Sequence, residues 1–253
     1  MKMKQVFLPG MLAVTLALLF VAPSCKKDED SNGISHDCPL TFIDARDGQE
    51  YKAVLIGRQC WMAENLNSGE MIQGNIDQSN NGIYEKYCHD NDEDNCDIYG
   101  GLYQWDELMQ YSSGEKNGGL CPEGWHISSD EEWLILEGTV DSQFLVGDPE
   151  WEKSNGVRGY DAGKNLKVDY DWKNNNTGLD KYGFSALPSG LYSNYIEDFS
   201  NLKYESWWWT PVETSNDDVG IHGFYSDSDK SIRYVYLKYK SSSFGYSVRC
   251  LKN

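Results

Sequence analysis

Positive charge is scarce in this sequence. It contains 22 lysine and arginine residues against 40 aspartate and glutamate residues, and the formal net charge is −18 at pH 7. Binding to nucleic acid or to an anionic lipid surface requires clustered positive charge, so the composition argues against both classes of partner. An acidic surface also keeps an exported protein soluble, and the charge by itself therefore identifies no partner.

The motifs of common hydrolases are also absent. Neither a Gly-x-Ser-x-Gly nor a His-Glu-x-x-His pattern occurs, and the four histidines are scattered: His36, His89, His126 and His222. Carboxylates are so numerous that no single pair stands out as an acid–base couple. We therefore predict that the protein is not an enzyme. His126, which lies between Trp125 and Ile127, is interpreted as a hydrogen-bonded structural histidine.

Long hydrophobic runs are missing except at the N-terminus. There, two lysines precede an apolar stretch that a Pro-Gly pair interrupts, and the remaining run at residues 11–22 is too short to span a membrane. This pattern predicts a signal peptide over residues 1–24. It ends at Ala22-Pro23-Ser24-Cys25, which resembles a bacterial lipobox and implies lipidation of Cys25 as the first mature residue. Ordinary cleavage by signal peptidase I is the alternative.

Residues 25–37 form a polar, charged segment after the predicted cleavage site. It begins Lys26-Lys27-Asp28-Glu29-Asp30 and has the composition of a solvated tether. The segment resembles the signal by which many Bacteroidetes lipoproteins are carried to the outer face of the outer membrane. We expect a surface-exposed outer-membrane lipoprotein whose partner is the membrane lipid, through Cys25.

Six further cysteines indicate three disulfides, because the number is even and the chain is predicted to be exported: Cys38, Cys60, Cys88, Cys96, Cys121 and Cys250. No CxxC or CxxH spacing favours zinc. Six cysteines allow fifteen pairings, and position favours two of the bonds. Cys88 and Cys96 bracket a short polar loop, and Cys121 with Cys250 would join the central segment to the last strand, which leaves Cys38 with Cys60.

The hydrophobic pattern predicts an α+β fold. Residues 50–56 alternate as a strand that is buried on most of both faces, and Ser129 with Glu132 forms a capping box that begins a helix ending near Gly138. Apolar residues at helical spacing predict a short helix over 102–111. Further strands are predicted near 183–187, 205–210, 220–225, 232–238 and 245–251, with a loop over 147–177. No linker or internal repeat is evident, so residues 38–253 are predicted to form one domain.

Five segments occur in an order that is typical of one family: residues 57–66, 99–105, 121–133, 183–190 and 245–250. Together they resemble the Fibrobacter succinogenes major paralogous domain (FISUMP) over roughly residues 40–252. The chain departs from the family at Ser128, where proline is usual, and at residues 207–211. Both are interpreted as structural positions.

A more distant resemblance concerns the fold alone. The segment that begins at Trp125 and the disulfide-closed C-terminal half are similar to C-type-lectin-like folds, of which the formylglycine-generating enzymes are one branch. The resemblance implies a single disulfide-stapled domain with short helices and a twisted antiparallel sheet. An oxidase of that branch requires free, neighbouring cysteines, whereas Cys121 and Cys250 are predicted to be bonded.

Two segments are candidate binding sites. Trp207 and Trp209 should share one face of a strand and Trp208 the other, so that an exposed face could stack on a glycan, although packing of all three in the core is the alternative. Asp90, Asp92 and Asp94 place oxygen ligands at alternate positions and are weak calcium candidates. This segment departs from the EF-hand pattern, and a solvated acidic loop is the alternative.

These observations predict a non-catalytic cell-surface lipoprotein that serves as a recognition or adhesion module. Its ligand is not identified, and the candidate partners are a glycan or a surface protein. The alternatives are a structural envelope protein without a specific ligand and a glycan-binding, lectin-like protein. No cofactor is expected other than calcium at the weak site.

Overall fold

Alternating side chains produce the first long strand. In β2 (Glu50–Ile56), Tyr51, Ala53 and Ile56 are buried, whereas Leu55 is exposed. Each face of β2 is covered in part, because Tyr51 and Ala53 pack in one hydrophobic cluster, whereas Ile56 and the partly buried Val54 pack in another. The prediction that most of both faces are buried therefore holds in part, since Lys52 and Leu55 remain exposed.

The computed structural model describes residues 37–112, 118–174, 178–213, 219–237 and 243–253. The predicted signal peptide and Cys25 lie outside these residues. The chain from His36 to Asn253 forms one compact unit. No helix in the described ranges combines the length and the hydropathy that a membrane span requires.

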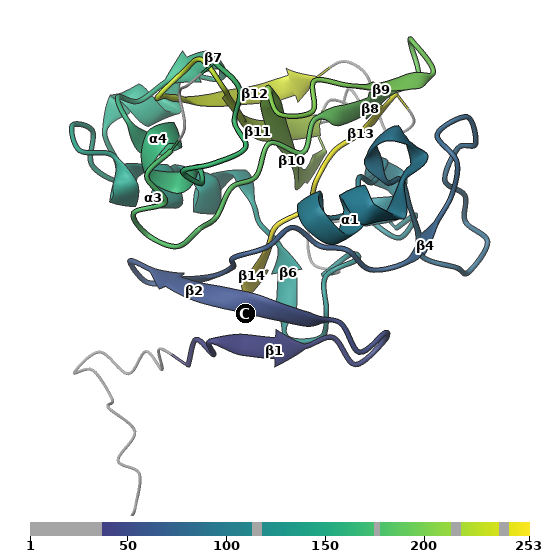
Figure 1. Cartoon of the computed structure of the whole chain (residues 1–253). Helices are drawn as coiled ribbons and strands as arrows, with labels where there is room; N and C mark the ends of the chain where they lie inside the picture. The colour runs from purple at the N-terminus through teal and green to yellow at the C-terminus, as the bar shows by residue number, and fades with distance from the viewer. Residues whose placement is uncertain (1–36, 113–117, 175–177, 214–218, 238–242) are drawn as a thin grey trace, which may run out of the picture. The chain divides into compact units, whose positions relative to one another are not determined.

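Strand β2 belongs to a five-stranded antiparallel sheet (Figure 1). In spatial order its strands are β1 (Thr41–Ile43), β2, β3 (Gln59–Met62), β14 (Cys250–Lys252) and β6 (Trp125–Ile127). The C-terminal strand β14 pairs with β3 on one side and with β6 on the other. The end of the chain therefore joins two segments of its first half.

Three further sheets complete the domain. A four-stranded antiparallel sheet contains, in order, β10 (Glu205–Glu213), β11 (Val219–Tyr225), β12 (Ser231–Leu237) and β7 (Asn155–Arg158). A three-stranded antiparallel sheet contains β13 (Phe244–Gly245), β8 (Leu191–Ser193) and β9 (Asp198–Ser200), and a parallel pair contains β4 (Glu70–Met71) and β5 (Glu85–Lys86). The α+β class is confirmed, but separate sheets replace the single twisted sheet that was predicted.

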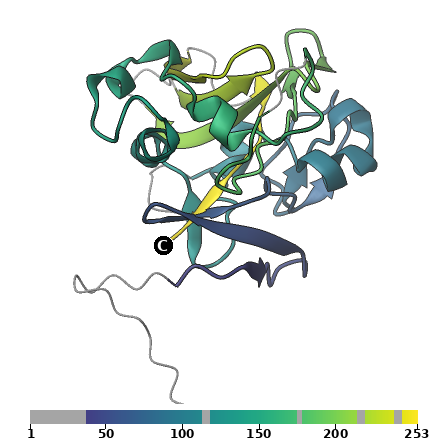
Figure 2. The ribbon, with the colours of Figure 1, turned by 60° about the vertical axis from the view of Figure 1, so that its left-hand side comes forward.

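The helices are short. They are η1 (His89–Asn91), α1 (Glu93–Tyr99), α2 (Trp105–Leu108), α3 (Asp130–Val140), η2 (Pro149–Glu152) and α4 (Ala162–Leu166). Figures 1 and 2 show α3 and α4 beside the four-stranded sheet, with α1 and the β4 segment at the other side of the domain. The predicted loop over 147–177 thus contains η2, β7 and α4, and that prediction is wrong.

Helix α3 begins at the predicted capping box. The Ser129 side chain accepts a hydrogen bond from the Glu132 backbone N–H, and the Glu132 carboxylate accepts one from the Ser129 backbone N–H. The helix continues past Gly138 and ends at Val140. Glycine at 138 serves packing instead of termination, because a Cβ there would lie 2.7 Å from the backbone of Val146.

Three other predicted elements differ in the structure. Residues 183–187 form no strand, because Gly183 and Ser185 have positive φ values of 73° and 55°. Leu102 pairs with Tyr87 as an isolated bridge, so the helix predicted over 102–111 is confined to α2. The strand predicted over 245–251 is divided into β13 and β14 because the chain crosses between two sheets.

An aromatic cluster fills the core between the sheets. The Trp133 ring lies 5.2 Å from Trp61, 5.7 Å from Phe184, 5.4 Å from Trp208 and 5.0 Å from His222, measured between ring centroids. Such contacts add to the free energy that the burial of the rings supplies. This packing brings together segments that are far apart in the sequence.

The buried Arg249 guanidinium connects the same segments. It donates hydrogen bonds to Asn65 Oδ1 at 2.7 Å, Met62 O at 2.9 Å and Phe184 O at 2.5 Å. Burial lowers the pKa of Arg249 to about 9. These oxygen acceptors compensate for the water that the guanidinium loses, so Arg249 forms a structural centre that joins residues 57–66, 183–190 and 245–250.

Candidate functional site

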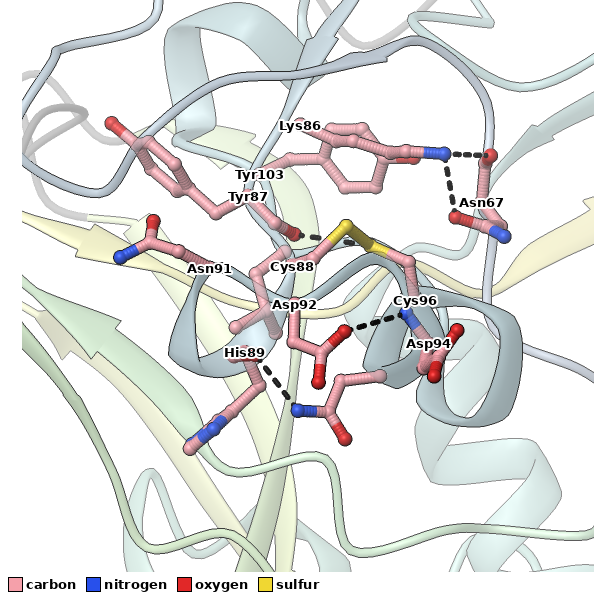
Figure 3. The surroundings of a disulfide bond; sticks show 12 residues. Asn67, Lys86, Tyr87, Cys88, His89, Asn91, Asp92, Asp94, Cys96 and Tyr103 are labelled. Atoms are coloured by element: carbon pink, nitrogen blue, oxygen red, sulfur yellow. Dashed lines mark hydrogen bonds between the residues drawn. A yellow bond between two sulfur atoms is a disulfide. The ribbon is translucent and has the colours of Figure 1, made fainter.

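A disulfide closes the segment that follows β5 (Figure 3), and its two cysteines line a surface hollow. The chain turns through Asp90 and Asn91, whose φ values of 59° and 56° suit aspartate and asparagine better than most residues. The Asp92 carboxylate then caps α1, and Cys96 in this helix bonds to Cys88. The disulfide therefore holds α1 against the chain that leaves β5.

The calcium candidates lie in this segment and have local roles instead. Asp92 caps α1, Asp94 lies in the first turn of that helix, and Asp90 Oδ1 is 3.2 Å from His89 Nδ1. In the part of the chain that the structure describes, no group of three or more His, Cys, Asp or Glu side chains could hold a metal ion. The alternative of a solvated acidic segment agrees with the structure, because residues 90–94 are exposed, but the segment is helical from Glu93 and is not a loop throughout.

Lys86 is the central cation of the groove. Its Nζ donates two hydrogen bonds of 2.8 Å, to the backbone oxygen and to Oδ1 of Asn67 (Figure 3). Burial lowers the pKa of Lys86, although the negative charges of Asp47, Asp97 and Glu93 act in the opposite direction. The half-buried ammonium thus fixes the Asn67 side chain at the edge of the groove.

The groove consists of three adjoining hollows. Two have volumes of about 490 Å³ and the third of about 230 Å³. Asp97 lines all three, and Lys86 lines the two larger ones. The smallest is also lined by Gln49, Asn67 and Tyr170, which come from three distant segments. The shared residues place the three hollows next to one another, and we refer to them together as the groove; polar and apolar side chains both line it.

Two tertiary contacts form the smallest hollow. The Asn67 backbone N–H donates to the Tyr51 hydroxyl at 3.0 Å, which holds the loop after β3 against β2. The Tyr99 hydroxyl donates to Asp171 Oδ2 at 2.5 Å, which holds the end of α1 against the loop of Tyr170. Each wall of the hollow is thus positioned by a contact between segments that are not neighbours in the sequence.

Several polar groups in the groove are not used by the fold. The carboxylates of Glu70, Glu93 and Asp97 make no hydrogen bond or ion pair with the described residues. The Asn67 side chain accepts from Lys86 through Oδ1, and its Nδ2 has no acceptor within the described ranges. These donors and acceptors are therefore open to a ligand.

The tryptophan candidates do not form a surface site. Trp207, Trp208 and Trp209 are only 5%, 0% and 0% exposed. Both faces of β10 are covered, because Trp207 and Trp209 pack in one hydrophobic cluster and Trp208 packs in another. The glycan-stacking hypothesis is therefore wrong for these three residues, and packing in the core is their role.

His222 lies in a buried ionic cluster instead of a catalytic arrangement open to solvent. Its Nε2 is 2.9 Å from Asp130 Oδ1, its Nδ1 is 3.1 Å from Glu137 Oε1, and Arg158 Nη2 is 2.5 Å from Glu137 Oε2. Burial alone would raise the pKa of Asp130, but hydrogen bonds from His222 and Arg233 lower it well below its usual range. The carboxylates of Glu137 and Asp130 pair with the guanidinium groups of Arg158 and Arg233, so the buried charges are neutralised, as a structural network requires.

His126 is hydrogen-bonded through both ring nitrogens, as predicted. Nε2 is 2.9 Å from Glu132 Oε1, and Nδ1 is 2.6 Å from Asn253 Oδ1. The hydrogen bond to Glu132 raises the pKa of His126 above 6.5. Burial raises the pKa of Glu132, but the hydrogen bonds from His126 and Ser129 outweigh it and lower that pKa below 4.5.

The His126–Glu132 pair should stabilise the fold most between pH 4.5 and 6.5. Its contribution should be lost as the pH rises through the raised pKa of His126, and also as Glu132 is protonated below pH 4.5. Urea unfolding of the wild type and of His126→Gln, at about pH 5.5 and about pH 8.5, measures the effect. The difference in unfolding free energy between the two proteins should shrink at the higher pH. A pH-independent difference would contradict the prediction.

The groove residues were not found from the sequence. Asn67 directly follows one of the family segments, which is a weak signal, but Lys86, Asp97 and Tyr170 lie in stretches without a motif. Only the Cys88–Cys96 pair marked the region. The three disulfides join Cys38–Cys60, Cys88–Cys96 and Cys121–Cys250, the pairing that sequence position favoured.

Comparison with known proteins supports one assignment. The model of the Fibrobacter succinogenes major domain family (Fib_succ_major) matches residues 54–252. No curated protein and no solved structure matches the chain.

Proposed function

The chain belongs to the Fibrobacter succinogenes major domain family, and we propose that this member is a non-catalytic recognition module on the cell surface. The observation that carries the proposal is the groove around Lys86 and Asp97. It combines open polar groups with a base that a disulfide holds in place. A rigid groove loses little conformational entropy when a ligand binds, which favours recognition.

Two of the histidines, His126 and His222, support a non-catalytic role. A general acid or base must reach the proton that it transfers. His126 and His222 each have both ring nitrogens in contact with Asn, Asp or Glu side chains. All four ring nitrogens are thus occupied by side chains of the protein itself, and none is left to exchange a proton with a substrate.

Lipidation at Cys25 supplies the anchor in this proposal. We also propose a C-type-lectin-like plan, which the motif order and the disulfide that joins Cys121, in the segment before β6, to Cys250 in β14 support.

Adhesion of intact bacteria that express the full chain tests the recognition role. Cells carrying the wild type, Asp97→Arg or Asp94→Arg are compared on surfaces coated with collagen, mucin or polysaccharide. Both aspartates lie in α1, but only Asp97 lines the groove. We expect at least a fivefold loss of adhesion for Asp97→Arg on the surface that retains the wild type, and little loss for Asp94→Arg.

Display and anchoring are tested in the same cells. Added protease should degrade the wild-type protein on intact cells, and Cys25→Ala should release it from the membrane fraction. Protection from protease would contradict surface display. Equal adhesion of the wild type, Asp97→Arg and cells without the protein, on every surface, would favour a structural envelope protein without a specific ligand.

A further inference from the structure

We propose that the smallest hollow of the groove binds one ring of a neutral, hydroxyl-rich saccharide. This inference rests on the proposed recognition function and names its ligand class. The hollow presents an apolar surface and open polar groups together. A pyranose has the same dual character, because its C–H groups form an apolar face and its hydroxyls form a polar rim.

The apolar part of the hollow comes from Tyr170 and Ile98. These residues are 58% and 55% exposed, although each side chain is large enough to gain from burial. Tyr170 directly precedes Asp171, and the hydrogen bond from the Tyr99 hydroxyl to Asp171 holds this part of the chain in position. A tyrosine ring held in this way offers a flat contact surface at a low cost in side-chain entropy.

The polar part comes from Gln49, Asn67 and Asp97. Asn67 Nδ2 is an open donor, and both oxygens of Asp97 are open acceptors among the described residues. Gln49 Nε2 donates to Glu50 O at 3.3 Å, while its Oε1 accepts no hydrogen bond from the described residues. Each sugar hydroxyl both donates and accepts, so this mixture suits a hydroxyl-rich ligand better than a purely cationic or anionic one.

Charge in the groove selects against acidic sugars. The open carboxylates are those of Glu70, Glu93 and Asp97, while Lys86 is already hydrogen-bonded to Asn67. Arg46, the other cation of the groove, is bound to Asp44 with its Nη2 2.5 Å from Oδ2. A uronate or sulfate group would therefore meet a net negative charge, because the open carboxylates outnumber the ammonium of Lys86.

The groove continues beyond the first ring. One of the two larger hollows is lined by Tyr84, an exposed tyrosine over whose ring the Arg46 guanidinium lies at 5.2 Å. Asp97 and Asn67 are shared between the hollows. An oligosaccharide can therefore contact two tyrosines along one path, and it should bind more tightly than a monosaccharide.

Calorimetric titration tests this ligand class on the full chain, purified in a detergent without a sugar head group. The probes are neutral hexose oligosaccharides of one, three and six units, and uronic-acid oligomers of the same lengths. We expect a neutral hexamer to bind at least tenfold more tightly than the monosaccharide and than the uronate hexamer. Absence of binding by every neutral probe, or equal binding of uronates, would overturn the inference.

Amino-acid substitutions test whether the sugar binds in the smallest hollow. Tyr170→Ala should weaken neutral-sugar binding at least tenfold, and so should Asn67→Asp, which removes the open donor but keeps the acceptor for Lys86. Tyr160→Ala is the matched control, because Tyr160 is 54% exposed and does not line the groove hollows. Sugar binding that Tyr170→Ala leaves unchanged would reject this site.

The adhesion experiment separates the two proposals. If Asp97→Arg abolishes adhesion to collagen while no neutral sugar binds, the saccharide inference fails and the recognition role survives. If Asp97→Arg affects neither adhesion nor sugar binding, both proposals fail.

Discussion

Replacement of both Cys121 and Cys250 by alanine should lower the free energy of unfolding by about 5 kcal/mol. The bond joins residues that are 129 positions apart, so its loss frees the largest loop in the unfolded chain. It also links the segment before β6 to β14, which is the neighbouring strand in the five-stranded sheet. Guanidinium unfolding of the oxidised proteins, followed by tryptophan fluorescence, measures the loss.

The two shorter disulfides provide matched controls. The Cys38–Cys60 bond spans 22 positions and the Cys88–Cys96 bond spans 8. Their removal by the same double alanine replacement should cost about 3.5 and about 2.5 kcal/mol, because the loops are shorter. Equal losses for the three double variants, or the greatest loss for Cys88–Cys96, would contradict the loop-length explanation.

Replacement of Glu137 by glutamine should destabilise the fold by about 3–5 kcal/mol. The Glu137 carboxylate accepts from Arg158 through one oxygen and contacts His222 through the other, and all three side chains are fully buried. Glutamine keeps the shape of the side chain but removes its charge. The buried Arg158 guanidinium would then lack its counter-ion, and urea unfolding at neutral pH should show the cost.

A double-mutant cycle distinguishes this effect from a loss of packing. Arg158→Met in the Glu137→Gln background should restore part of the stability, so that the double variant loses at least about 1 kcal/mol less than the sum of the single losses. The Glu150–Lys153 pair, in which Lys153 is exposed and Glu150 is half-buried, is the control, and Glu150→Gln should cost no more than about 1 kcal/mol because the amide oxygen can still accept from the Gly159 N–H. Additive losses for Glu137 and Arg158 would show that the pair is not coupled.

The features that the sequence predicted correctly depend on neighbouring residues. Ser129 and Glu132 are three positions apart, and their hydrogen bonds form within one helical turn. The alternation in residues 232–238 predicted a strand that the structure has as β12. Such local patterns predict elements well because the interactions that produce them involve only a few adjacent residues.

The role of the triple tryptophan could not be predicted in this way. A strand places Trp207 and Trp209 on one face whether that face meets solvent or another sheet. The structure covers both faces, and the Trp208 indole donates to Asn65 Oδ1 at 2.9 Å. Burial depends on what packs against a strand, and that information is spread over the whole chain.

The groove is the strongest example of a feature that could not be predicted from local sequence patterns. Gln49, Asn67, Asp97 and Tyr170 come from four separate segments and share no spacing pattern. They meet because the Tyr51–Asn67 and Tyr99–Asp171 hydrogen bonds bring their segments together. A binding hypothesis for these residues therefore required the three-dimensional arrangement.

The amino-acid sequence by itself determined the family, the α+β class and the helix start at Ser129, and its cysteine positions favoured the disulfide pairing. These properties follow from ordered motifs and from short-range chemistry. Only the tertiary structure decided that the tryptophans are core residues and that Asp97 and Tyr170 line one hollow. Exposure and convergence are set by long-range packing, because a side chain is covered or left open by segments remote from it in the sequence.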